Sequence, residues 1–145
     1  MIKNYKNSYK VTEKELVSLS VYNVGFQKCD ALYQWGPGIR DHYLIHYIIS
    51  GKGYYKVKNN TFTLEAGDAF LVYPNTEVLY YADEVTPWEY AWVGFTGSDA
   101  SMILKATDLL RNALSSAMLC LANPFTARFF IFMMHAATNL NMPLK

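Results

Sequence analysis

The sequence has little of what most secreted proteins and enzymes depend on. Its 145 residues include two cysteines, Cys29 and Cys120, and three histidines. The two cysteines lie far apart, without a neighbouring cysteine or a metal-type spacing, so neither a disulfide framework nor a metal site is indicated. The start, Met-Ile-Lys-Asn-Tyr-Lys, does not resemble a signal peptide. We therefore expect free thiols and a cytoplasmic location.

Charge and long apolar runs are also scarce. Charged residues make up 17% of the chain and the formal net charge is +1, which offers no electrostatic footprint for nucleic acid. The lysines between Lys3 and Lys14 are partly offset by Glu13 and Glu15, and they predict a solvated arm. The run Phe129–Met134 is far shorter than the roughly 18 apolar residues that a membrane span requires. No membrane contact is expected.

Between Asp41 and Gly97 the sequence is dense in strand-forming residues. Short segments rich in Tyr, Val, Ile, Phe and Trp alternate there with turn residues, which favours an antiparallel β-sandwich or barrel in a single domain. The interior of a small barrel can hold a ligand. The predicted strands are His42–Ser50, Tyr54–Lys58, Thr61–Leu64, Ala69–Tyr73, Val78–Ala82 and Trp88–Phe95.

The flanking segments are less regular. Leu16–Tyr22 and Phe26–Cys29 predict two earlier strands joined by a turn at residues 23–25, and Trp35–Gly38 predicts a loop because proline removes a donor and fixes φ. After Gly97 the composition becomes helical, with an N-cap at Ser98 and apolar residues at helical spacing from Leu109. A break at Asn123-Pro124 separates this stripe from a second one. These apolar helices require a cover: the barrel, a second copy or a further domain.

The two strongest strands have distinct faces, since side chains alternate across a strand. Both faces of the first are largely apolar, which predicts a central strand. One face of the first carries His42, Leu44, His46 and Ile48; one face of the last carries Trp88, Tyr90, Trp92 and Gly94. We expect the aromatic face of the last strand to line the barrel interior.

The sequence offers few candidates for metal ligands or catalytic residues. His42 and His46 share a face but lie about 13 Å apart at four residues of strand spacing, too far to share one ion. The sequence has no His-x-His pair, no Gly-x-Ser-x-Gly elbow and no base beside either cysteine. Its paired acids sit at turns, where carboxylates are usually solvated. No metal, cofactor or catalytic residue is therefore predicted.

A ligand pocket made of rings and hydroxyl groups remains. The pocket forms if the strands close as expected. Its walls are then Arg40, Tyr81, Tyr90 and Trp92, and Trp35 lies at its rim. Aromatic rings stack on the C–H faces of sugars, and polar donors satisfy sugar hydroxyls. His42 is expected to be a packed or ligand-contacting imidazole. The alternative is that these rings simply form the core.

Three runs together resemble the amino-terminal sensor domain of AraC-type transcriptional regulators. They are Arg40–Gly53 with its Gly51-Lys52-Gly53, Leu64–Pro74 with Gly67-Asp68 before an apolar strand, and the Trp-rich Pro87–Gly97. The resemblance covers roughly residues 16 to 106, and its specificity lies in the combination. It implies a mainly β fold: a cupin-like antiparallel barrel, or jelly roll, followed by C-terminal α-helices.

The resemblance also implies a function. The family binds a small-molecule effector, commonly a sugar, dimerises through the helices and contacts DNA through a further C-terminal domain. Matching positions place a pocket tyrosine on Tyr81, a polar pocket residue on Tyr90, the sugar-stacking tryptophan on Trp92 and the pocket arginine on Arg40.

The expected organisation is therefore an effector-binding barrel with its arm at residues 1–97 and a helical dimerisation or linker segment at residues 98–145. No basic recognition helix follows Gly97, so the DNA-binding domain is expected to be absent from this chain. Two alternatives stay open. One is a small metal-dependent cupin enzyme, an isomerase or oxygenase; the other is a ligand-free oligomerisation module.

Overall fold

The computed structural model describes residues 4–10 and 19–106, which form nine strands and one helix. The strands are β1 (Lys6–Lys10), β2 (Ser20–Lys28), β3 (Gln34–Gly38), β4 (Tyr43–Ser50), β5 (Lys52–Val57), β6 (Asn60–Glu65), β7 (Ala69–Val72), β8 (Val78–Ala82) and β9 (Glu89–Thr96), and the helix is α1 (Ala100–Ala106). All neighbouring strands pair antiparallel. The mainly β fold that the sequence predicts is confirmed.

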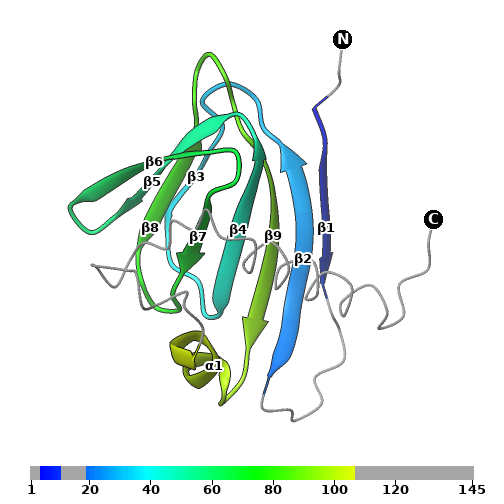
Figure 1. Ribbon diagram of the computed structural model, residues 1–145, viewed down its shortest axis with the longest axis vertical. Coiled ribbons are helices and arrows are strands. Elements are labelled where there is room, and N and C mark those ends of the chain that lie inside the picture. The colour runs from blue at the N-terminus through cyan, green and yellow to red at the C-terminus, as the bar shows by residue number, and fades with distance from the viewer. Residues whose placement is uncertain (1–3, 11–18, 107–145) are drawn as a thin grey trace.

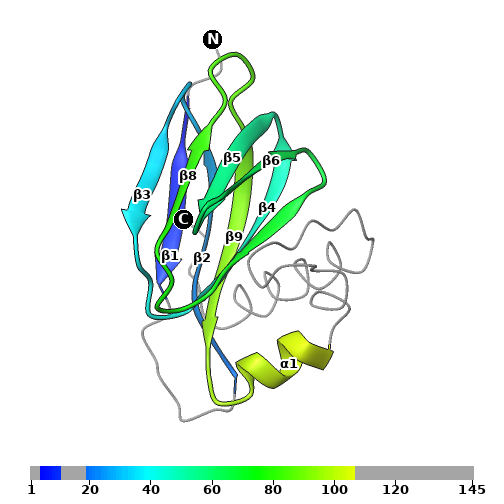
Figure 2. The ribbon, with the colours of Figure 1, turned by 90° about the vertical axis from the view of Figure 1, so that its left-hand side faces the viewer.

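The strands form two facing sheets, as in a jelly roll (Figures 1 and 2). The larger sheet has the order β1-β2-β9-β4-β7 and the smaller sheet the order β3-β8-β5-β6. Chain neighbours β4 and β5 lie in different sheets, and Gly51 makes the turn between them with a φ of 73°. A Cβ at Gly51 would also stand 2.4 Å from the Pro87 carbonyl oxygen. Only glycine meets both demands.

An inner core fills the space between the sheets. The inner core comprises Cys29, Leu44, Ile48, Tyr55, Val57, Leu64, Phe70, Val72, Val78, Tyr80, Ala82, Trp88, Tyr90 and Trp92. Its largest fully buried side chain, Trp88, packs where a side chain at Gly53 would be, since a Cβ there would stand 2.2 Å from the indole. Aromatic rings of both sheets therefore meet at the centre of the domain.

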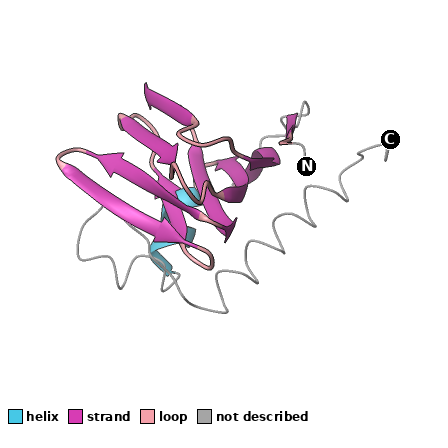
Figure 3. Ribbon diagram, turned by 90° about the horizontal axis from the view of Figure 1, so that it is seen from above, coloured by secondary structure: helices cyan, strands magenta, loops and turns pink. Residues whose placement is uncertain are grey.

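A second cluster, the outer core, covers the other face of the larger sheet. It comprises Val24, Ile45, Leu71, Ala91, Val93, Phe95, Ala100 and Leu104. The last two belong to α1, which follows β9 directly at the end of the sandwich (Figure 3). Strands β4 and β9 are thus buried on both faces, as their sequence pattern predicts, and the aromatic face of β9 points inward.

Two sequence predictions of local structure are wrong. Residues 23–25 do not form a turn: β2 runs through them with a register shift between Val21 and Asn23. Gly25 is needed there because a Cβ would stand 2.2 Å from the Trp92 ring. Residues 35–38 are not a loop but most of β3, an edge strand, where a proline without an N–H is tolerated.

Both ends of the described chain add to the sandwich. The predicted polar arm contains β1, which pairs with β2 along its whole length at the edge of the larger sheet. Helix α1 begins two residues after the expected N-cap, Ser98, and the Ala100 N–H donates to the Gly97 carbonyl at 3.3 Å. The apolar stripes predicted from Leu109 onward lie outside the described residues. Among the described helices, none is long and apolar enough to cross a membrane.

The loop before β9 is organised by one buried carboxylate, Asp83. Its oxygens accept from the Tyr54 hydroxyl at 2.8 Å and from the backbone N–H groups of Thr86 and Val85 at 3.0 and 3.1 Å, and Lys52 lies 3.4 Å away. These contacts, the Thr86 N–H foremost, hold the pKa of Asp83 well below its usual range. The carboxylate thus ties the β8–β9 loop to β5.

Asp83→Asn is expected to lower the melting temperature by several degrees at pH 7, because the amide cannot accept all of these hydrogen bonds. The folded-state pKa lies below the unfolded value of about 3.9, so this stabilisation is complete above that pH and is lost as the pH falls toward the folded pKa. Melting curves from pH 3 to 8 test this. Glu84→Gln, at an exposed neighbouring acid, is the control; an equal effect of both changes would contradict the assignment.

Candidate ligand-binding site

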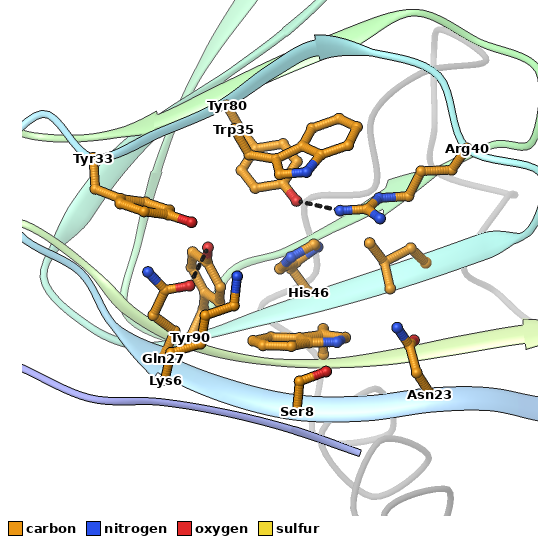
Figure 4. A pocket seen from close by; sticks show the side chains of 12 residues that line it. Lys6, Ser8, Asn23, Gln27, Tyr33, Trp35, Arg40, His46, Tyr80 and Tyr90 are labelled. Atoms are coloured by element: carbon orange, nitrogen blue, oxygen red, sulfur yellow. Dashed lines mark hydrogen bonds between the residues drawn. The ribbon is translucent and has the colours of Figure 1, made fainter. Parts of the chain in front are cut away.

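A cavity of about 200 Å³ lies between the two sheets (Figure 4). Its volume is below the ~300–1,000 Å³ typical of pockets for drug-sized ligands, which limits an occupant to about one small ring. Its walls come from β1, β2, β4 and β9 of the larger sheet, from β3 and β8 of the smaller sheet, and from the loops on either side of β3. The lining residues are Lys6, Ser8, Asn23, Gln27, Tyr33, Trp35, Arg40, Leu44, His46, Tyr80, Tyr90 and Trp92.

One wall is a stack of aromatic rings topped by a cation. Trp35 lies on Tyr80 with ring centroids 5.2 Å apart and 16° between the planes. The guanidinium carbon of Arg40 lies 4.0 Å from the Trp35 ring centroid, a cation–π contact. Arg40 Nη2 also donates to the Tyr80 hydroxyl at 3.3 Å (Figure 4). The strand pairing of β3 with β8 brings these rings together.

His46 forms the floor from the middle of β4. Its imidazole stacks on Phe70 at 4.5 Å and meets the edges of Tyr80 and Tyr90 at 4.9 and 4.8 Å. Burial, and then the nearby Arg40 charge, lower the pKa of His46 well below its usual value. The imidazole is therefore neutral at physiological pH. It can exchange hydrogen bonds with a ligand but is a poor proton acceptor.

The hydroxyls of Tyr80 and Tyr90 stay protonated, so these two side chains are neutral too. Burial raises the pKa of Tyr80 to about 12 and raises that of Tyr90 further. The Tyr90 hydroxyl donates to Gln27 Oε1 at 3.5 Å, a long contact. Beneath it, burial raises the pKa of the Cys29 thiol to about 11, so this cysteine is not an activated nucleophile. The site is thus suited to hydrogen bonding rather than proton transfer.

Three polar atoms of the lining residues are buried without a hydrogen-bond partner among the described residues. They are Asn23 Oδ1, Arg40 Nε and His46 Nδ1. Buried polar atoms in folded proteins nearly always have a protein, water or ligand partner. A polar molecule in the cavity would supply the missing partners. This concentration of unpaired atoms around one cavity distinguishes it from an ordinary core void.

The family of the chain follows from sequence comparison. The profile of the AraC-like ligand binding domain matches residues 21–137. The chain belongs to this family. The match includes every predicted and observed pocket residue except Lys6 and Ser8 of β1, which precede it.

Curated relatives of this AraC-like domain are regulators of operons. It is 43% identical over 108 residues to the Msm operon regulatory protein of Streptococcus mutans, covering 74% of this chain and 39% of that protein. It is 38% identical over 90 residues to the raffinose operon transcriptional regulatory protein RafR of Pediococcus pentosaceus, covering 61% of this chain and 32% of that protein. The chain thus spans 39% and 32% of the length of these two relatives.

Solved structures similar to the AraC-like domain share its fold. They include YhaK from Escherichia coli, with a TM-score of 0.55 and 13% identity over 64% of this chain and 45% of that one. The cupin domain of Schizosaccharomyces pombe Cnp3 has a TM-score of 0.51 and 12% identity over 72% of this chain and 73% of that one. The predicted cupin-like architecture is confirmed.

The AraC-like domain brings four of the six predicted site residues to one cavity. Arg40, Trp35, Tyr90 and Trp92 all line it. Tyr81 does not: β8 turns Tyr80 inward, and Tyr81 stacks on Tyr54 at 5.0 Å on the opposite face of the smaller sheet. The aligned position was one residue away from the inward-facing tyrosine, and on a strand one residue changes the face.

His42 is the second predicted residue that does not line the cavity. It directly precedes β4, and it is not among the residues that line the cavity. Its imidazole stacks on Tyr22 at 4.1 Å, and its Nδ1 lies 2.8 Å from Asp41 Oδ1. Of the two roles expected for His42, a packed or a ligand-contacting imidazole, the structure shows the packed one.

Sequence reasoning missed several lining residues of the AraC-like domain. Tyr80 and His46 carry a usable signal, because each lies two residues from inner-core residues of the same strand and so shares their face. No sequence signal identifies Asn23, Gln27 and Tyr33, because single polar residues on a strand or loop do not belong to a recognisable motif. Within the described residues, no three His, Cys, Asp or Glu side chains gather as metal ligands.

Proposed function

We propose that this domain is the effector-sensing part of a transcriptional regulator, not an enzyme, and that its effector is a sugar with one ring in the cavity. The observation that carries the proposal is the cavity itself: aromatic rings from both sheets surround three unpaired polar atoms. Apolar faces and unsatisfied hydrogen-bonding atoms together match a pyranose, which has C–H faces and a rim of hydroxyls.

Each residue has a role in this proposal. Trp92 stacks on the ring, and Trp35 holds the Arg40 guanidinium in place by its cation–π contact. Arg40, Tyr90, His46 and Asn23 exchange hydrogen bonds with the sugar hydroxyls. Names of relatives support the ligand class, since one regulates a raffinose operon and another, from Staphylococcus xylosus, is a lactose operon transcription activator at 27% identity. Raffinose and lactose both contain a galactosyl ring, which makes galactosides the first candidates.

Regulation would follow from changed packing around the cavity. Lys6 and Ser8 of β1 line it, and β9 connects it to α1. A ligand that prefers one arrangement of these elements shifts the population toward it. In the proposed full-length homodimer, residues 98–145 carry the dimer contact and a further domain binds DNA, so the shift would change the placement of two DNA-binding domains.

A thermal-shift panel tests the ligand class. Galactose, melibiose, raffinose and lactose are compared with sorbitol, which has no ring, at equal concentration. A ligand at about 100 times its Kd adds roughly 2.7 kcal/mol of stability, so a true effector raises the melting temperature in a saturable manner. If none of these four sugars does so, a neutral galactoside is not the effector. Stoichiometric Mn, Fe or Zn in the purified protein would instead favour an enzyme.

A further inference from the structure

The charge of the cavity lining is one-sided. Among the described residues that line it, Arg40 and Lys6 are cations and none is an acid. Within the same part of the chain, Lys52 pairs with Asp83 and His42 contacts Asp41, and neither contact includes a lining residue. The lining thus carries two positive charges that have no carboxylate partner among residues 4–10 and 19–106.

The environment of Arg40 does not neutralise it. In the described part of the chain its guanidinium contacts two neutral groups, the Trp35 ring at 4.0 Å and the Tyr80 hydroxyl at 3.3 Å, and its buried Nε has no partner there. A half-buried cation is costly unless it is paired and fully hydrogen-bonded. The unpaired edge of the guanidinium is a planar donor, the geometry that carboxylates and phosphates bind best.

The other donors on the lining point to the same chemistry. Arginine, lysine and the two indoles can only donate hydrogen bonds, whereas the tyrosines, serine and amides can do either. Lys6 is exposed on β1, and Figure 4 shows it at the far end of the lining from Arg40. Its charge attracts an anion from solvent, but Arg40 is placed to hold one.

We propose that the effector is a sugar bearing an anionic group, a carboxylate or a phosphate, with that group seated against Arg40. This inference rests on the proposed sugar-sensing function and narrows it. The sugar ring then occupies the space over Trp92 and His46, and the anion supplies the acceptor that Arg40 Nε lacks. A neutral sugar would leave the positive charge uncompensated.

The test compares matched ligands by isothermal titration calorimetry on the whole chain. Galactose, galacturonate, galactose 6-phosphate and inorganic phosphate are titrated at low and high salt. We expect at least one acidic sugar to bind about tenfold or more tightly than galactose, as for a charge-assisted pair, and to weaken with salt. The two acids distinguish carboxylate from phosphate.

Variants assign the effect to Arg40. Arg40→Gln should remove the preference for the acidic sugar while keeping residual sugar binding, and Arg40→Lys should restore part of it. Lys56→Gln removes the same charge from an exposed position on β5 and should change nothing. Circular dichroism spectra verify that each variant is folded.

The outcomes separate this inference from the proposed function. If galactose binds as tightly as the acidic sugars, the anion site is wrong and the sugar sensor stands. If phosphate alone binds as well as the phosphorylated sugar, the cavity holds anions without recognising a sugar, which also overturns the inference. If no sugar of either kind binds, the proposed function itself fails.

Discussion

Trp88→Ala is expected to destabilise the domain by about 3–5 kcal/mol, the range for removing a buried tryptophan or phenylalanine. Trp88 is fully buried, stacks on Phe70 at 5.9 Å and meets Tyr90 edge-on at 5.5 Å. Gly53 cannot fill the gap because it has no side chain. The total free energy of unfolding of a small domain is only about 5–15 kcal/mol, so the variant loses a large part of its stability. Urea unfolding monitored by circular dichroism measures this loss.

Two further variants make the Trp88 prediction specific. Trp88→Phe keeps a ring against Phe70 and should cost clearly less than the alanine change. Val85→Ala alters a side chain that is 84% exposed in the adjacent loop, and surface changes usually stay within about 0.5 kcal/mol. A Trp88→Ala protein that unfolds at the wild-type urea concentration would show that the inner core does not carry the stability assigned to it.

Trp92→Ala is expected to weaken binding of the effector by roughly 30-fold, the equivalent of about 2 kcal/mol for an anchoring aromatic residue. The Trp92 ring packs against Gly25 of β2, where a Cβ would stand 2.2 Å from it, and Trp92 lines the cavity. Loss of the ring removes the stacking surface for the sugar. Calorimetric titration with whichever sugar stabilises the wild type measures the change.

Tyr81→Ala is the matched control, since Tyr81 is an aromatic residue on the outward face of β8. It should keep wild-type affinity. Trp92→Phe should recover part of the lost affinity, because a smaller ring still stacks. Equal losses in Tyr81→Ala and Trp92→Ala would mean that both act through general stability, and the stacking role would be wrong. Each titration needs a melting curve to show that the variant is folded at the assay temperature.

The strands from β4 to β9 could be predicted closely from the sequence, because apolar alternation and turn residues act locally. The errors have non-local causes. Gly25 suggests a turn in isolation, yet its role is to make room for Trp92, which lies across the β2–β9 pairing. Pro37 suggests a loop, yet it lies in β3, an edge strand, where a residue without an N–H is tolerated. Neither the partner ring nor the edge position can be read from neighbouring residues.

The site was predictable in part for the same reason. Trp92 and Tyr90 follow from alternation on a strand whose ends are well marked, and Arg40 precedes a strand of similar clarity. The prediction that Tyr81 lines the pocket is wrong because two tyrosines are adjacent at positions 80 and 81. An alignment does not show which of the two faces the interior. His42 and His46 share a face, and only the three-dimensional extent of the cavity separates them.

The alternation of β9 has a consequence for how such domains diversify. Its even-numbered residues, Tyr90 and Trp92, face the ligand cavity, whereas Val93 and Phe95 belong to the cluster that holds α1. A point mutation at an even position can change which molecule is recognised without disturbing the helix contact, and the reverse holds at an odd position. In the proposed sensor, ligand preference and the contact with α1 can therefore be selected separately within the eight residues of this strand.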